Sequence, residues 1–372
     1  MYPGSPIDAE RSRWERTYGT RFHRPTWWHD GDQEFLSEWV DPSSELTYRE
    51  RERLQHEHLA PILAEIPGRF VYRGPARDYF LRAATQQRAS TSPRWRLGYA
   101  ERYYAWQRYL GRGAAGRAER RTDAGLHDAC RAIRTEALPA VAQIVGASEE
   151  AWNNGAMAPI REALEAVARE CFVPLDAVAR SVRDVTVPLD ATGGATVSAM
   201  HAYARSYELL GVRAGDAVLD LGCGTGYGAA LLSQLVGASG RVYGVELDPR
   251  LAALAQENVA PFGNVTVVAG DAADPAAWPV ARPARVVVGF ALPEVPLAWA
   301  DALAPGAVVV APVVDGAAQR LVRVTFLPAP LVERFDAVLY VPQRTAADLP
   351  PPREAPASQV SAPVRRHLPL LT

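Results

Sequence analysis

The sequence predicts a doubly wound α/β domain in its C-terminal half, preceded by a mainly helical N-terminal domain that is rich in Trp and Arg. From about residue 159 onward, short runs of Val, Leu and Ala alternate with helical segments, which is the pattern of repeated βαβ units. A glycine-rich string follows the first of these runs, and an acidic residue ends the next one. Together these features favour a Rossmann-like sheet with a ligand at its carboxyl edge.

Five apolar runs of five or six residues have the length and the β-branched composition of buried parallel strands. They cover 217–221, 242–246, 265–269, 285–290 and 307–311. The helices predicted between them cover 227–236, 251–258 and 296–303, and a further helix at 160–171 precedes them. Strands that alternate with helices in this way form a parallel sheet.

The first 157 residues have a different composition, with seven of the nine Trp of the chain. Apolar spacing and turn residues predict helices at 47–66, 97–110 and 122–145. We therefore expect three parts: an N-terminal domain at 1–157, an α/β domain at 158–348, and a tail at 349–372. The tail holds six Pro and has no apolar periodicity, which predicts an extended segment.

Composition is that of an ordinary globular protein, with 48% hydrophobic and 22% charged residues. No run of 18 apolar residues occurs and the N-terminus is charged, so we expect neither a membrane span nor a secretory signal. Three widely separated cysteines, Cys130, Cys171 and Cys223, fit a reducing cytoplasm. We predict no metal site: His56 and His58 lack the i, i+4 spacing of a helical metal pair.

All 40 basic residues are Arg, a bias that we attribute to base composition of the genome. Between Arg69 and Arg134 there are 15 Arg and five acidic residues. This excess predicts a surface for an anionic partner, whereas solvated helix faces explain it equally well. A nucleic-acid module would also use such an excess, but no recognised nucleic-acid motif is present.

The glycine string predicts the cofactor site. Gly222, Gly224 and Gly226 follow the strand that contains Asp220. Glycines are needed where the backbone turns sharply and a cofactor approaches it closely. The spacing differs from the Gly-x-Gly-x-x-Gly of dinucleotide folds, and the acidic Asp220 suits a cationic ligand better than a pyrophosphate. We therefore predict S-adenosylmethionine, which carries a sulfonium and an ammonium group.

Two further acidic positions complete the predicted cofactor site. Glu246 ends the second strand, where a carboxylate accepts hydrogen bonds from ribose hydroxyls. Asp271 follows the third strand, where it would accept an adenine amino group. Their neighbours Leu247 and Ala272 complete the predicted set.

Four motifs in order resemble those of the protein-L-isoaspartate O-methyltransferase family. Residues 167–174 (VARECFVP) are similar to its opening helix and Phe-Val-Pro signature, and 194–201 (GATVSAMH) to its substrate loop. Residues 215–242 are similar to the cofactor-binding half of that family, and 338–342 (VLYVP) to its closing strand. The resemblance covers 162–342, about half of the chain.

The resemblance implies methyl transfer to an aspartyl or isoaspartyl carboxylate. Ser198 and Thr196 would then be the catalytic residues, and His201 and Met200 would bind substrate. Ser198 would orient the carboxylate by a hydrogen bond; alternatively it only caps the following helix. The sequence departs from the family at Met200, which replaces a loop proline, and at Ala284, which replaces an Asp and is expected near the approaching substrate.

Several functions are compatible with these residues. The large N-terminal domain favours an enzyme dedicated to one peptide, and an acidic precursor in ribosomal peptide maturation, where the ester can close to an aspartimide, is the leading interpretation. General repair of isoaspartyl residues is the first alternative. Methylation of a peptide C-terminus or of a small-molecule carboxylate is the second, and a non-catalytic adenosylmethionine-binding regulator is least favoured because the substrate loop is retained.

Overall fold

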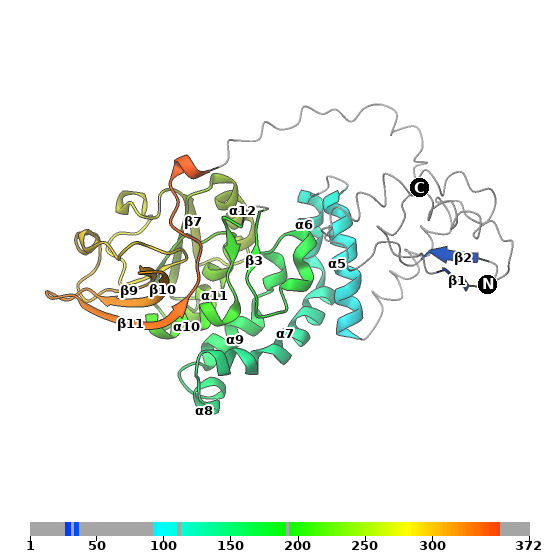
Figure 1. Cartoon of the computed structure of the whole chain (residues 1–372), viewed down its shortest axis with the longest axis horizontal. Coiled ribbons are helices and arrows are strands. Elements are labelled where there is room, and N and C mark those ends of the chain that lie inside the picture. Colours follow the sequence, from blue (N-terminus) through cyan, green and yellow to red (C-terminus); the bar gives the residue numbers. More distant parts are fainter. Residues whose placement is uncertain (1–26, 31–32, 37–91, 110–112, 191–192, 350–372) are drawn as a thin grey trace. The chain divides into compact units, whose positions relative to one another are not determined.

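The computed structural model describes residues 27–30, 33–36, 92–109, 113–190 and 193–349 (Figure 1). The chain divides into two compact units, Met1–Tyr99 and Ala100–Thr372. The first contains an antiparallel hairpin of β1 (Trp27–Asp30) and β2 (Gln33–Leu36). The helix predicted at 47–66 and nearly all of the tail predicted at 349–372 lie outside the described residues.

The second unit is built on a seven-stranded sheet with the order β11-β10-β9-β8-β5-β6-β7. The five strands from β9 to β7 are parallel, and β10 and β11 are added antiparallel at one end. The strands are β5 (Ala217–Leu221), β6 (Arg241–Glu246), β7 (Val265–Ala269), β8 (Arg285–Val288), β9 (Val308–Asp315), β10 (Ala318–Thr325) and β11 (Leu331–Val338). Because the chain first winds outward from β5 and then returns to its other side, the predicted doubly wound sheet is confirmed.

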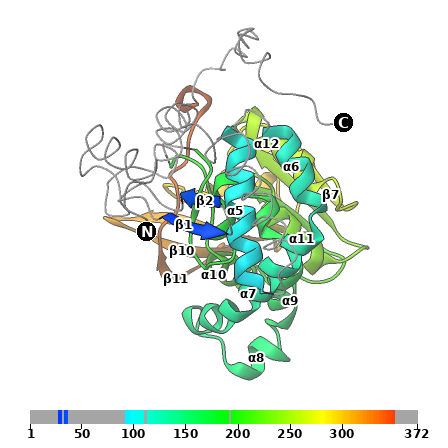
Figure 2. The ribbon, with the colours of Figure 1, turned by 90° about the vertical axis from the view of Figure 1, so that its right-hand side faces the viewer.

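Alternation along the strands divides the core between the two faces of the sheet. In β5, Val218 packs in one hydrophobic cluster, and Leu219 and Leu221 pack in another. The first cluster contains side chains from six helices, which are α7 (Ala124–Ile144), α8 (Glu149–Asn153), α9 (Ala158–Ala166), α10 (Met200–Leu210), α11 (Tyr227–Val236) and α12 (Pro249–Val259). These helices and α6 (Gly113–Thr122) are drawn in Figures 1 and 2. Asp220, two residues after Val218, points to this helical face.

The second face is covered differently from the prediction. The helix predicted at 296–303 is the short 3₁₀ helix η7 (Leu297–Asp301), whose Trp299 packs edge-on against Trp278 with ring centroids 5.3 Å apart. Large aromatic rings supply the apolar cover that a longer helix would otherwise give.

The strand predicted at 338–342 is also displaced, since β11 ends at Val338 and only an isolated bridge joins Pro342 to Ala291.

Helices α6 and α7 belong to the same compact unit as the sheet, so the boundary between units falls at 99/100 rather than at the predicted 157/158. The helix predicted at 97–110 corresponds to α5 (Pro93–Tyr109), and the one at 122–145 to α7. The helix predicted at 160–171 is shorter: α9 ends at Ala166 and a 3₁₀ turn, η4 (Arg169–Cys171), follows.

A buried ion pair explains why α7 cannot be separated from the sheet. Glu170 has no exposed surface and accepts a 3.0 Å hydrogen bond from Arg134 of α7, which is itself 1% exposed. His127 of the same helix lies 2.8 Å from the other carboxylate oxygen. Burial alone would raise the pKa of Glu170, but the hydrogen bond from His127 and the positive charge of Arg134 hold it below its ordinary value.

Among the described residues, five of the 15 arginines between Arg69 and Arg134 bind groups of their own chain. Arg120 is buried and donates to the carbonyls of Cys171 and Val173, at 3.0 and 2.9 Å. Other arginines of the described helices pair with acidic side chains, namely Arg108 with Asp176, Arg117 and Arg121 with Glu257, and Arg134 with Glu170. These side chains bind their own chain, so they contribute less to an anion-binding surface than their number suggests.

We predict that Glu170→Gln lowers the free energy of unfolding by about 3 kcal/mol, because it leaves the buried Arg134 without a charged partner. Urea denaturation followed by tryptophan fluorescence measures this change. Glu162→Gln is the matched control, since the Glu162 side chain is 65% exposed and pairs with Arg161 on the surface. Its effect should stay below about 0.5 kcal/mol, and equal losses in the two variants would contradict the buried ion pair as a stabilising element.

Candidate active site

The site begins at the loop that joins β5 to α11. Gly222, Gly224 and Gly226 all have positive φ, at 78°, 58° and 88°. A Cβ at Gly222 would lie 2.6 Å from Cδ1 of Phe290, and one at Gly226 would lie 2.7 Å from Cγ1 of Val259. Both backbone conformation and space therefore require glycine, as the sequence predicts for a loop that closely approaches a cofactor.

Glu246 lies beside this loop at the carboxyl end of β6. Its carboxylate accepts hydrogen bonds from the backbone amides of Gly224, at 2.8 Å, and Asp248, at 3.0 Å. The residue is 6% exposed, and burial raises the pKa of this carboxyl. The loop and the second strand are thus held together by a carboxylate at the place where the sequence predicts a ribose acceptor.

Asp220 is a buried acidic group at this edge with an unsatisfied oxygen. It is 5% exposed, and no donor among the described residues lies within hydrogen-bond distance of Oδ2. Burial, together with the negative charge of Glu246, raises the pKa of Asp220 to about 7. A buried carboxylate without a partner favours a cation, which fits the ammonium group of the predicted cofactor.

The remaining predicted cofactor residues lie at the same edge of the sheet. Asp271 follows β7 and is exposed, and its Oδ1 accepts the amide of Ala273 at 2.9 Å. Ala272 is buried in the cluster on the second face, and Leu247 is half-buried after β6. The carboxyl ends of the adjacent parallel strands β6 and β7 therefore bring these positions to one edge of the sheet.

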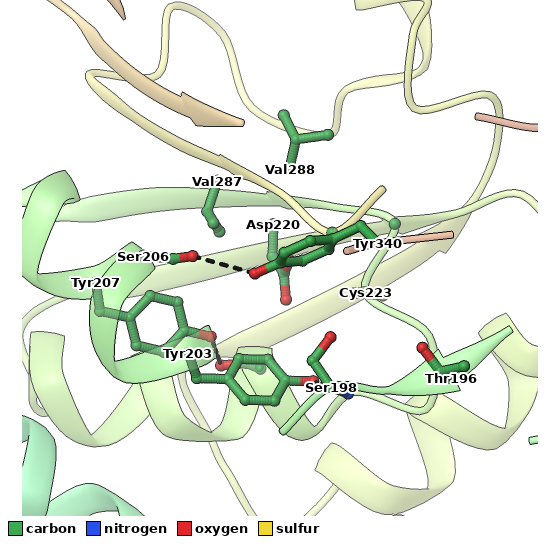
Figure 3. Close-up of a pocket in the computed structure, with 13 residues that line it drawn as sticks. Thr196, Ser198, Tyr203, Ser206, Tyr207, Asp220, Cys223, Val287, Val288 and Tyr340 are labelled. Atoms are coloured by element: carbon green, nitrogen blue, oxygen red, sulfur yellow. Dashed lines mark hydrogen bonds between the residues drawn. The ribbon is translucent and has the colours of Figure 1, made fainter. Parts of the chain in front are cut away.

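A cavity of about 30 Å³ opens between this edge and α10 (Figure 3). At that size it holds about two water molecules. Its polar lining comes from four elements: the loop with Thr196 and Ser198, helix α10, strand β5 with Asp220, and the segment after β11. The lining residues are Thr196, Ser198, Tyr203, Ser206, Tyr207, Asp220, Gly222, Cys223, Gly228, Val287, Val288, Gly289 and Tyr340.

Four of these polar residues escaped the sequence analysis. Tyr203, Ser206 and Tyr207 lie one helical turn apart on α10, and this i, i+3, i+4 spacing directly after the substrate loop is the signal that could have identified them. The fourth, Tyr340, lies in the predicted closing segment, which the sequence analysis used only as a signature. Hydroxyl groups therefore dominate the cavity wall opposite the glycine loop.

Tyr340 is fixed over the cavity by its backbone. The side-chain amide of Gln319 accepts from the Tyr340 amide at 2.7 Å and donates to its carbonyl at 3.1 Å. The Tyr340 hydroxyl then lies 3.4 Å from the hydroxyl of Ser206, the contact drawn in Figure 3. Tyr340 lies beyond the end of β11, and there the Gln319 side chain makes the two backbone hydrogen bonds that a neighbouring strand would otherwise make.

The substrate loop leads directly into α10, and its helix cap is not Ser198. The cap residue is Ala199, and Asp184 accepts the His201 amide at 3.0 Å. Asp184 also lies 2.8 Å from Nδ1 of His201, whose side chain is 39% exposed. Met200 is fully buried in the core, so its side chain does not reach the cavity.

The expectation that Ala284 lies near the approaching substrate is wrong. Ala284 precedes β8, and its carbonyl accepts the amide of Val308 at the amino end of the parallel strands. The cavity contains Val288 and Gly289 at the opposite end of β8. At about 3.3 Å per residue, roughly 13 Å of strand separates Ala284 from Val288.

A doubly wound sheet, a glycine loop after its first strand and an acidic residue after its second occur in both dinucleotide-binding proteins and Rossmann-like methyltransferases. The spacing of Gly222, Gly224 and Gly226 and the buried Asp220 beside them define the class of S-adenosylmethionine-dependent methyltransferases. The comparison with known proteins gives the family. The family model described as protein-L-isoaspartate(D-aspartate) O-methyltransferase matches residues 149–347. Because this match covers more than half of the chain, the chain belongs to that family, whose members are S-adenosylmethionine-dependent carboxyl O-methyltransferases.

Individual relatives agree with this assignment. The protein-L-isoaspartate O-methyltransferase of Methanothrix thermoacetophila is 35% identical over 199 residues, which cover 52% of this chain and 91% of that protein. The enzyme of the same name from Ignicoccus hospitalis is 39% identical over 157 residues, 41% of this chain and 72% of the relative. Separately from that assignment, the chain is similar in structure to a solved protein-L-isoaspartate O-methyltransferase of Plasmodium falciparum, with 20% identity and a TM-score of 0.44 over 50% of this chain and 90% of that one.

The described residues contain neither a membrane-spanning helix nor a cluster of metal-binding side chains. None of the described helices combines the length and apolar character that crossing a bilayer requires. Nor does any group of three or more His, Cys, Asp or Glu able to hold a metal occur within the described part of the chain. His56 and His58 lie outside that part.

We predict that binding of S-adenosylmethionine tightens about fivefold between pH 6 and pH 7 and then levels off, because Asp220 must lose its proton to bind an ammonium group. Below its pKa of about 7 the carboxyl is neutral and binding releases a proton. Calorimetric titration in buffers of different ionisation enthalpy measures both the affinity and the proton. Asp220→Asn should bind more weakly and lose this slope; if the slope persists, another group titrates.

Proposed function

We propose that this protein transfers a methyl group from S-adenosylmethionine to the free α-carboxylate of isoaspartyl residues in proteins and peptides of varied sequence. The observation that carries the proposal is the cavity in which Ser198 and Thr196 face the glycine loop and Asp220. Two relatives of which the alignment covers 91% and 72% carry the name of this activity. The family match includes every residue of this cavity.

The cofactor residues follow from the chemistry of the groups they would hold. Asp220 would bind the ammonium group, Glu246 the ribose hydroxyls and Asp271 the adenine amino group, with Leu247 and Ala272 beside the adenosine. The three loop glycines let the backbone approach closely. When bound, S-adenosylmethionine supplies an electrophilic methyl group on a positively charged sulfur.

The protein's own residues have little proton chemistry to perform. An isoaspartyl carboxylate with a pKa near 4 is about 99.9% ionised at pH 7, so no general base is required. Ser198 and Thr196 would donate hydrogen bonds to the oxygen that does not attack, and His201, held by Asp184, would bind the flanking peptide. The hydroxyl-lined wall of α10 and Tyr340 would exclude bulk water, so positioning and desolvation supply the rate.

Action on one dedicated peptide is the second candidate, because about 148 residues precede the family match. This reading gives the N-terminal region the role of binding an acidic precursor, with an ester or an aspartimide as product. The intramolecular pairing of Arg108, Arg117, Arg120, Arg121 and Arg134 weakens its electrostatic argument. We therefore place general activity first.

The three cysteines are free thiols, which supports a cytoplasmic location.

We predict that Ser198→Ala lowers kcat/KM for an isoaspartyl peptide by about 10- to 100-fold, the equivalent of a lost hydrogen bond to a charged group. The affinity for S-adenosylmethionine, measured separately, should be unchanged. Ser239→Ala is the control, since Ser239 is an exposed residue of the turn before β6. A Ser198→Ala enzyme with wild-type kcat/KM would remove Ser198 from the acceptor site.

Peptide selectivity separates the two candidate functions. We expect comparable kcat/KM values, within about tenfold, for short isoaspartyl peptides of unrelated sequence, and a chain that begins at residue 92 should keep them because the sheet unit starts near there. Methyl ester formation is followed by mass spectrometry, with the matching aspartyl peptides as controls. Activity on only one peptide, lost on truncation, would instead support the dedicated enzyme.

A further inference from the structure

We propose that Arg169 is a positioning residue for the acceptor site: its buried guanidinium holds the acceptor loop, residues 195–199, by the backbone carbonyl of Ser198. The inference rests on the proposed function, because it assigns a role to the loop that would bind the substrate carboxylate. Arg169 itself does not line the cavity. It acts from behind the loop.

The contacts of Arg169 are numerous and short. The side chain has no exposed surface and donates to four carbonyl oxygens. Nη1 donates to Arg183 at 2.8 Å and to Ser181 at 3.2 Å. Nη2 donates to Val185 at 2.8 Å and to Ser198 at 2.7 Å. The carbon of the guanidinium also lies 5.7 Å from the ring centroid of Tyr227.

These four carbonyls belong to two segments that are distant in sequence. One segment, 181–185, contains Asp184, which holds both the amide and the ring of His201. The other is the acceptor loop itself. A single rigid cation thus fixes Ser198 and, through Asp184, the start of α10 relative to each other. The carbonyl of Ser198 is anchored inward while its side chain lines the cavity.

Only a guanidinium can make this set of contacts. Its planar fork presents five N–H donors in fixed directions, whereas a lysine ammonium has three donors on one atom. Burial lowers the pKa of Arg169, the mark of a cation with costly desolvation, and its bonded partners are carbonyl dipoles rather than a carboxylate. Fixing a reactive geometry is a use that justifies such burial, because a misplacement of about 1 Å costs roughly 100-fold in rate.

Arg120 provides a matched control within the same chain. It is 1% exposed and donates to the carbonyls of Cys171 and Val173, so it resembles Arg169 in burial and in bond type. The carbonyls that it binds, those of Cys171, Val173 and Pro174, lie outside the acceptor loop. Loss of either arginine should destabilise the fold, but only loss of Arg169 should disturb the acceptor site.

The test compares Arg169→Lys and Arg120→Lys in the full-length protein. For Arg169→Lys we expect KM for an isoaspartyl peptide to rise at least tenfold, while Kd for S-adenosylmethionine stays within twofold of wild type. Hydrogen exchange should accelerate at least tenfold in residues 195–199. Arg120→Lys should leave both KM and loop exchange within twofold of wild type.

The outcomes are distinguishable. Unchanged KM and loop exchange in Arg169→Lys, or equal changes in both variants, would overturn the positioning role. If Arg169→Lys does not fold, Arg169→Gln takes its place. In the wild-type protein, hydrogen exchange in residues 195–199 that is as fast as in the exposed turn at 237–239 would also overturn the positioning role. A wild-type enzyme inactive on isoaspartyl peptides refutes the proposed function instead, and the exchange comparison still decides the role of Arg169.

Discussion

The structure depends on the burial of one short segment, Arg169 to Val173, whose polar groups are satisfied from three directions. Glu170 is bound by α7, and the carbonyls of Cys171 and Val173 are bound by Arg120 of α6. Thr225 of the glycine loop donates to the Phe172 carbonyl at 2.7 Å. Buried backbone groups must find partners, so this segment ties the preceding helices, the cofactor loop and the acceptor loop to one another.

The cofactor half of the site could be predicted because its chemistry is local in sequence. Strand alternation, the spacing of three glycines and the acid twenty residues later are all visible in the chain, and each occupies the expected edge of the sheet. At Gly226, for example, the positive φ explains why the sequence has a glycine. Local backbone constraints leave strong sequence patterns because few residue types satisfy them.

The acceptor half was less predictable because tertiary contacts build it. Tyr340 reaches the cavity from a segment more than 130 residues after Ser206, and a glutamine from a third element fixes it. Nothing in the local sequence marks Gln319 for that task. The predicted positions of Met200 and Ala284 beside the substrate were wrong for the same reason. A motif gives the order of residues along the chain, but it does not say which of them face the site. The sequence likewise predicts a separate domain at 1–157, and it does not reveal that Arg134 in that range pairs with Glu170.

The ion pair between Arg134 and Glu170 has a consequence for how such proteins diversify. A recombination breakpoint just before residue 149, where the family match begins, would separate a fully buried carboxylate from its cation. An incoming N-terminal segment without an equivalent arginine would leave that charge stranded, at a cost comparable to much of a domain's total stability. In this chain a junction upstream of α6 would keep Arg134 together with Glu170, so α6 and α7 are expected to move with the catalytic domain in any exchange of N-terminal segments.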